Sequence, residues 1–187
     1  VIMRSYLRAG PDIIMVGEMR DKETTSIGIE ASLTGHLVLA TLHTNSAPES
    51  VTRLLDMGMD PFNFADALLG ILAQRLAKRL CKCKEVARQE IRDDWVKQYG
   101  NDNGEIMLCK PVGCDNCAGT GFSGRVGLHE LMTASDELKK NIQEHARVAE
   151  MLVTALGDGM RTLKQDGIEK VLQGVTDIHQ VRVVCIK

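Results

Sequence analysis

The amino-acid sequence predicts an α/β fold built on a parallel sheet, and three observations carry that prediction. The first is a short, continuously apolar run at Ile13–Val16, which closes at Gly17. The second is a similar run at residues 36–45, and the third is the segment Lys22–Leu33 between them, where Gly28 is the only breaker. A strand, a helix and a second strand in this order predict parallel pairing with a right-handed crossover, and the apolar runs predict strands buried on both faces.

Two helix-start signals follow the second predicted strand. Ser46 is placed as an N-cap, with a proline two residues later and Glu49 completing a capping box. Asp60 is likewise placed as an N-cap, with Pro61 at the first helical position, and we expect the helix that they begin to extend to Leu80. Four leucines would form its buried stripe: Leu68, Leu69, Leu72 and Leu76.

Beyond residue 80 the sequence predicts a loop-rich module and then a mostly helical region. Hydrophobic periodicity disappears over residues 81–124, where cysteines and glycines concentrate. The stretch RVGLHELM, residues 125–132, predicts a strand. Residues 136–185 predict helices separated by four glycines: Gly157, Gly159, Gly167 and Gly174.

Composition excludes some classes of function. The 187 residues carry a net charge of -2, and the basic residues are scattered, so the sequence lacks the basic footprint of a nucleic-acid-binding protein. Its most apolar region, residues 67–77, is too short to span a bilayer and contains Gln74 and Arg75. The chain begins at Val1 without a signal peptide, and we expect it to be a fragment. A chain of this size without a secretory signal is expected in a reducing compartment, so metal binding is favoured over disulfides for its six cysteines.

Polar residues follow both predicted strands where these end. Glu18 follows the first apolar run, and His43, Thr44 and Asn45 end the second. Ligands of parallel sheets bind beyond the carboxyl ends of the strands, so the carboxylate is placed to orient water or a magnesium shell, with His43 or Asn45 sensing a γ-phosphate. The alternative is that Glu18 and Arg20 form a surface ion pair and that His43 is an ordinary loop histidine.

Long stretches of the sequence resemble the secretion ATPases that drive type II secretion and type IV pilus assembly. LRAGPDIIMVGEMRDKET resembles their acidic box, and SLTGHLVLATLHTNSAPESVTRLLDMGMDPF is similar to their Walker B and histidine boxes. ILAQRLAKRLC, followed by GCDNCAGTGFSGRVGLHEL, is similar to their zinc-bearing arm. The resemblance covers nearly the whole chain. It is closer to the secretion and pilus-extension branch than to the retraction ATPases, in which the tetracysteine arm is absent.

The resemblance implies roles for several strand-end residues. Glu18 stands where the catalytic carboxylate is expected, and Arg20 and Asp21 lie in the acidic box. Arg20, together with His43 of the histidine box, is expected to bind or sense the nucleotide. Leu33 opens the stretch LTGHL at the Walker B position and is not acidic, so the general-base role falls on Glu18. Structural roles are expected for Thr34, Gly35 and His36, and Arg125 is either a surface arginine or a contact to a nucleotide or a neighbouring subunit.

The resemblance also implies a zinc site formed by Cys81, Cys83, Cys114 and Cys117. Tetrahedral zinc takes four thiolates from two separated pairs, and Cys114 and Cys117 form a C-x-x-C pair. Cys81 and Cys83 form the tighter C-x-C, delivered by the helix predicted to end at Leu80. Two alternatives stay open: a set of Cys83, Cys109, Cys114 and Cys117, or a metal-free arm. Cys185 is expected in the core, and neither His129 nor His145 has ligand spacing to a cysteine pair.

The resemblance implies the carboxyl-terminal half of a hexameric motor that hydrolyses ATP with Mg²⁺. Part of a RecA-like sheet with flanking helices is expected at 1–80, the zinc-binding arm at 81–124, and a short strand with a helical region at 125–187. No G-x-x-x-x-G-K-[ST] occurs, so we expect the phosphate-binding loop upstream of Val1. We expect no nucleic-acid partner and no transmembrane segment.

The expected setting is the cytoplasmic side of the bacterial inner membrane, with the motor bound peripherally to platform proteins of a secretion or pilus system. The competing hypothesis is a non-catalytic, zinc-stabilised interaction or chaperone-like module. The polar strand ends discriminate between the two, because such a module has no use for acidic and histidine clusters at the ends of adjacent buried strands.

Overall fold

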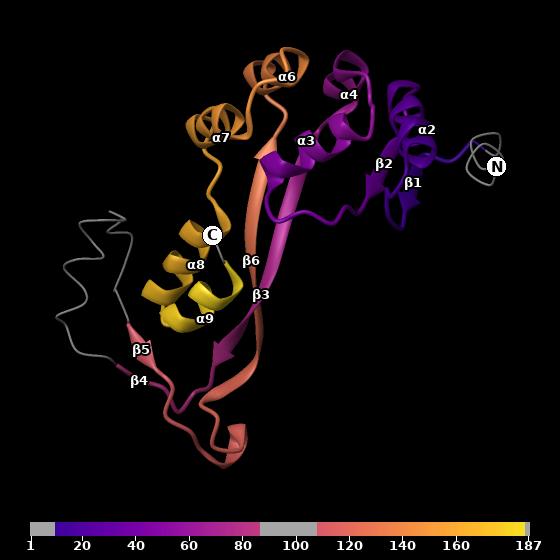
Figure 1. Cartoon of the computed structure of the whole chain (residues 1–187). Coiled ribbons are helices and arrows are strands. Elements are labelled where there is room, and N and C mark those ends of the chain that lie inside the picture. The colour runs from indigo at the N-terminus through magenta and orange to yellow at the C-terminus, as the bar shows by residue number, and fades with distance from the viewer. Residues whose placement is uncertain (1–9, 87–107, 186–187) are drawn as a thin grey trace. The chain divides into compact units, whose positions relative to one another are not determined.

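The computed structural model describes residues 10–86 and 108–185 and has a mixed α/β fold (Figure 1). Residues 7–9 of the predicted acidic box and residues 87–107 of the predicted arm lie outside the described residues. The elements follow in the order β1 Ile13–Val16, α2 Lys22–Leu33, β2 Leu37–Ala40, α3 Ala47–Asp56, α4 Pro61–Ala67, β3 Gly70–Leu80, β4 Glu85–Val86, β5 Cys109–Lys110, η1 Asp115–Cys117, β6 Phe122–Thr133, α6 Asp136–Gln143, α7 Val148–Gly157, α8 Leu163–Leu172 and α9 Ile178–Val184.

The chain forms two compact units. Unit 1 contains residues up to Ala73 together with Leu131–Met160, and unit 2 contains Gln74–Glu130 together with the residues from Arg161 onward. The boundary passes through β3 and β6, which pair with each other in a two-stranded sheet. Within the described residues, no helix has the length and apolar character needed to cross a bilayer.

The sheet of unit 1 has the predicted parallel pairing. β1 and β2 align with Ile13 opposite Leu37, and α2 connects them. Gly28 lies on the side of α2 that faces the sheet, because a Cβ there would sit 2.6 Å from the Met19 Cε atom and 3.8 Å from a methyl of Val38. α2 therefore packs closely on one face of this strand pair.

The predicted burial of both strand faces is wrong for the described residues. Ile13 is 60% exposed, Met15 is 67% exposed, and Leu39, which pairs with Met15, is 48% exposed. The apolar runs indicated the two strands correctly, because β-branched and leucine side chains suit extended backbone. The side chains on the face opposite α2 remain open to solvent.

The helix starts of unit 1 follow the predicted capping chemistry. The side chain of Asp21 accepts a hydrogen bond from Thr24 N at the start of α2, at 2.8 Å. Ser46 caps α3, and Asp60 caps α4, each through a bond to the backbone three residues on. Each cap satisfies a backbone N–H that the first turn of a helix leaves without a partner.

The predicted helix over residues 61–80 is wrong in its second half. α4 ends at Ala67, and β3 then runs from Gly70 to Leu80. The leucine spacing fits a helical stripe, but exposed and less exposed positions alternate along β3, with Leu72 57% and Leu76 50% exposed. Gly70 breaks the helix and brings the backbone against β6, where a Cβ would lie 3.0 Å from the Met132 carbonyl oxygen.

The core of unit 1 gathers side chains from helices and from the end of β6. Ala47 and Val51 of α3, Leu138 and Ile142 of α6, and Met132 of β6 are all fully buried. They belong to one cluster with residues of α4 and α7. This unit therefore has an apolar interior of its own.

In unit 2, α8 packs against β6, and α9 packs against α8. Leu128 is fully buried, and Ile168 and Val181 are nearly so. Gly167, predicted to separate two helices, instead lies inside α8. A Cβ at this position would lie 2.7 Å from a methyl of Val181 in α9, so a larger residue would clash there. The glycine is there to allow close approach of helices rather than to end one.

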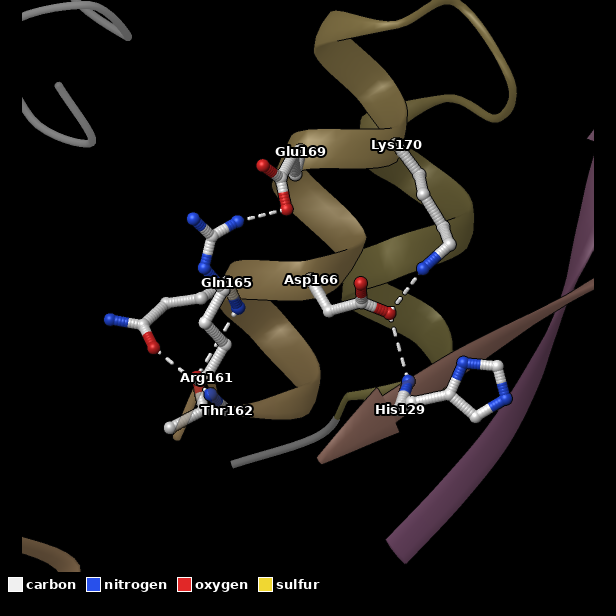
Figure 2. Close-up of polar contacts among 7 residues, drawn as sticks. All are labelled: His129, Arg161, Thr162, Gln165, Asp166, Glu169 and Lys170. Atoms are coloured by element: carbon white, nitrogen blue, oxygen red, sulfur yellow. Dashed lines mark hydrogen bonds and ion pairs between the residues drawn. The ribbon is translucent and has the colours of Figure 1, made fainter. Parts of the chain in front are cut away.

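The amino end of α8 is tied to β6 by polar contacts (Figure 2). Asp166 accepts hydrogen bonds from the backbone N–H of His129 at 2.8 Å and from Lys170. Glu130 is buried, and its carboxylate accepts a bond from Leu163 N at 3.2 Å. Figure 2 also shows the Thr162–Gln165 capping box and the Arg161–Glu169 ion pair. These contacts fix where α8 begins on the strand.

Candidate functional site

Glu18 lies just beyond β1, where backbone hydrogen bonds extend the contact between the two strands of unit 1. The Met19 N–H donates to the Thr41 carbonyl at 3.0 Å, and the Thr41 hydroxyl donates to the Gly17 carbonyl. Glu18 therefore lies between Gly17 and Met19, which both form hydrogen bonds with Thr41, the residue that follows β2. His43 follows Thr41 by two residues, which brings the two predicted site residues to the same edge.

The Glu18 carboxylate has a basic side chain on each oxygen. Arg20 Nη2 lies 2.5 Å from Oε2, and His43 Nε2 lies 3.3 Å from Oε1. The Glu18 side chain is only 19% exposed, whereas that of Arg20 is 75% and that of His43 is 87% exposed. The hydrogen bond from Arg20 is the main cause that holds the pKa of Glu18 below its usual range. An ionised carboxylate at a strand end can accept a proton or orient a water.

The neighbouring predicted residues make structural contacts. Thr34 caps the end of α2, and its hydroxyl donates to the Ala31 carbonyl at 2.9 Å. His36 Nδ1 lies 3.0 Å from the same carbonyl oxygen. Thr44 and Ser50 share a hydrogen bond of 2.6 Å between their hydroxyls. Asp21 of the predicted acidic box is the N-cap of α2, and the Thr24 N–H lowers its pKa.

Four cysteines of unit 2 bring their sulfur atoms together. Their Sγ atoms all lie within 4.8 Å of one another, and the residues are Cys81, Cys83, Cys114 and Cys117. Cys81 Sγ lies 3.9 Å from Cys114 Sγ, and Cys83 Sγ lies 3.9 Å from Cys117 Sγ. Zinc–sulfur bonds of about 2.3 Å in a tetrahedron place sulfur atoms ~3.8 Å apart. The cluster therefore offers a set of donor atoms and spacings that suit a metal ion such as zinc.

Backbone N–H groups point at one sulfur of this cluster. The N–H groups of Cys114 and Gly121 each lie 3.2 Å from Cys117 Sγ. Desolvation opposes ionisation of Cys117, but these two donors and the neighbouring thiols outweigh it and lower its pKa to about 6. This turn, the knuckle formed by residues 113–121, thus favours a thiolate at Cys117, and thiolate is the form that binds metal.

Glycines close the turn that carries Cys114 and Cys117. Gly113 has a φ of 116°, and a Cβ there would lie 2.6 Å from the Gly119 carbonyl oxygen. Gly121 has a φ of 75°, and a Cβ there would lie 2.5 Å from Pro111. Side chains at these positions would both strain the backbone and clash, so the tight knuckle depends on glycine.

The structure groups Cys81, and not Cys109, with the other three cysteines. Within residues 10–86 and 108–185, neither Cys109 nor a histidine belongs to the sulfur cluster. Cys109 is buried in β5, and Cys185 is partly buried at the end of α9. The strand β3, rather than the helix predicted from the sequence, delivers Cys81 and Cys83. Arg125 is exposed on β6.

Comparison with known proteins gives consistent results. A family model described as type II/IV secretion system protein matches residues 1–183. The type IV pilus assembly ATPase PilB of Thermus thermophilus is 46% identical over 184 residues, covering 96% of this chain and 20% of that protein. Type II secretion system protein E of Pectobacterium carotovorum is 45% identical over 181 residues, covering 96% of this chain and 35% of that protein.

Solved structures share the fold. The pilus retraction motor PilT with bound ADP matches with a TM-score of 0.68 and 25% identity, covering all of this chain and 43% of that one. The ATPase DotB of Legionella pneumophila matches with a TM-score of 0.66 and 21% identity, covering 97% of this chain and 40% of that one. The chain spans between a fifth and about a third of the length of the two curated relatives above. By its family match and its identity to these two curated relatives, the chain belongs to the type II/IV secretion system protein family.

Proposed function

We propose that this chain is the carboxyl-terminal part of a hexameric motor that hydrolyses ATP to power type II protein secretion or type IV pilus assembly. The observation that carries the proposal is the ionised Glu18 carboxylate just beyond β1, with Nε2 of His43, in the segment that follows β2, 3.3 Å away. Family membership supports it, because the curated relatives are pilus assembly ATPases and secretion proteins.

In this proposal Glu18 is the general base. It accepts the proton of the water whose oxygen bonds to the terminal phosphorus, while the bond from that phosphorus to the bridging oxygen breaks and ADP departs with the electron pair. His43 lies beside Glu18, at the edge of the sheet where the proposal places the nucleotide. Bound Mg²⁺ would neutralise charge on the phosphates. A phosphate-binding loop is absent from the 187 residues and is assigned to an upstream part of the longer protein.

The assignment to a larger assembly also fits the exposed sheet face of unit 1. Ile13, Met15 and Leu39 form an apolar surface of paired strands, and such surfaces are normally covered. We assign residues 1–80 to a RecA-like core, 81–124 to the zinc-binding arm and 125–187 to a helical carboxyl-terminal region. The partners would be identical subunits and platform proteins at the cytoplasmic face of the inner membrane.

The proposal predicts that the 187-residue chain alone has almost no ATPase activity, whereas the longer protein turns over ATP with Mg²⁺. Positioning of the phosphates is most of what such catalysis consists of, and the chain lacks the loop that positions them. Phosphate release from equal molar amounts of both proteins measures this. Substantial magnesium-dependent turnover by the short chain, or none by the long one, contradicts the assignment.

We further propose that Cys81, Cys83, Cys114 and Cys117 bind one Zn²⁺. Elemental analysis of protein prepared with zinc and reductant is expected to give about one zinc per chain, as a closed four-thiolate site requires. Cys81→Ser removes a ligand and lowers the zinc content to near zero. Cys109→Ser is the matched control, because Cys109 is buried outside the cluster, and this variant retains zinc. Retention by Cys81→Ser with loss by Cys109→Ser would assign the alternative ligand set.

A further inference from the structure

The two contacts on Glu18 use different oxygens of its carboxylate. Arg20 lies 2.5 Å from Oε2, and His43 lies 3.3 Å from Oε1. A carboxylate held at only one oxygen can still rotate about its terminal torsion, which is broad. Held at both oxygens, its plane is fixed, and the remaining lone pairs point in a defined direction.

The backbone on either side of Arg20 is fixed independently. Met19 donates its N–H to the Thr41 carbonyl at 3.0 Å, and Asp21 is the N-cap of α2, accepting from Thr24 N at 2.8 Å. Arg20 thus projects from a short segment with pinned neighbours, and its guanidinium reaches back two residues to Glu18. An exposed arginine on a free loop would spend much more side-chain entropy to hold such a contact.

We propose that Arg20 is a positioning residue that acts through Glu18 by orienting its carboxylate, rather than a group that binds the nucleotide. The inference rests on the proposed role of Glu18 as general base. It assigns Arg20 a different role from the nucleotide sensing that the sequence suggested. His43, on the other oxygen, has a side chain that is 87% exposed, so the rest of its ring stays accessible to a nucleotide at this edge of the sheet.

This assignment predicts a pH effect with a definite sign. Arg20 holds the pKa of Glu18 below its usual range, chiefly through the hydrogen bond. Without the guanidinium the pKa of Glu18 rises, so the base becomes protonated at a higher pH. The acid limb of the kcat profile therefore moves to higher pH in Arg20→Ala, and activity at pH 5 falls more than activity at pH 7.5.

The test uses the longer protein that carries this chain and compares Arg20→Ala, Arg20→Lys, Glu18→Gln and the double variant Glu18→Gln with Arg20→Ala. Arg20→Ala is expected to lower kcat about two- to five-fold at pH 7.5, the size of a partly exposed ion pair, with KM for ATP nearly unchanged. Arg20→Lys keeps a cation and recovers most of the loss. Arg182→Ala, on an exposed arginine of α9, is the control and leaves both kcat and the pH profile unchanged.

The double variant decides whether Arg20 acts through Glu18. If it does, Arg20→Ala lowers the residual turnover of Glu18→Gln no further. An equal fold-loss in both backgrounds, an unmoved acid limb, or a ten-fold weaker binding of a fluorescent ATP analogue would each overturn the inference. Near-normal turnover of Glu18→Gln is a separate result, since it refutes the proposed catalytic role of Glu18 itself.

Discussion

Removing the zinc ion proposed for this chain is expected to unfold the knuckle together with α8 and α9, while unit 1 keeps its structure. Metal binding and folding are coupled in small thiolate sites, with apparent binding free energies of roughly 10 kcal/mol or more. The cysteine cluster lies wholly in unit 2, and the core that contains α3, α6 and α7 lies wholly in unit 1. The loss of order should therefore follow the unit boundary.

The reason that α8 and α9 should respond is a set of bonds between the end of β3 and the turn joining these two helices. The Leu80 N–H donates to the Val175 carbonyl at 2.9 Å, and the Thr176 hydroxyl donates to the Lys78 carbonyl at 2.8 Å. Lys84, next to Cys83, donates to the Gly174 carbonyl at 2.5 Å. The segment that carries two of the four thiols is thus the same segment that holds the helix turn.

Hydrogen exchange of the chain with and without a zinc chelator, under reductant, measures this effect. Amides of residues 78–84, 114–121 and 163–184 should lose protection by about a factor of 100 or more, while those of α2, α3, α6 and α7 change little. Cys114→Ser and Cys117→Ser should reproduce the chelator result. Cys185→Ser is the control, because Cys185 lies outside the cluster. Unchanged protection of α8 and α9 after zinc loss would contradict the coupling.

Glu18→Gln in the longer protein is expected to lower ATP turnover by a factor of about 100 or more, with nucleotide binding largely retained. The substitution keeps the size of the side chain and one acceptor oxygen, but an amide cannot accept the proton of the attacking water. The loss should therefore fall on kcat rather than on KM. Steady-state phosphate release and equilibrium binding of a fluorescent ATP analogue measure the two parameters.

Glu144→Gln provides the matched control for this substitution. Glu144 is an exposed carboxylate at the end of α6 in the same unit, and its neutralisation should leave turnover within about two-fold of the parent protein. If Glu18→Gln behaves like Glu144→Gln, the general base lies elsewhere. If Glu18→Gln abolishes nucleotide binding, the carboxylate serves the bound metal or the structure rather than proton transfer.

The local sequence determined the parts of the fold that depend on neighbours in the chain. Asp21, Ser46 and Asp60 cap the helices that follow them, because a side-chain oxygen reaches a backbone N–H only three residues away. The apolar runs before Gly17 and after His36 gave the parallel strands, which the structure confirms. Long motifs also indicated the family, which the comparison confirms.

Only the tertiary structure decided features that depend on residues far apart in the sequence. Residues 70–80 suit either a helix or a strand by their own pattern, and pairing with β6, more than 40 residues further on, makes them a strand. In that strand Leu72 and Leu76 of the expected stripe are exposed. Cys81 rather than Cys109 joins the cluster because β3 ends beside the knuckle, where Cys81 N donates to the Gly121 carbonyl. Local pattern limits the conformations of a segment, but burial and strand pairing, which no single segment contains, select among them.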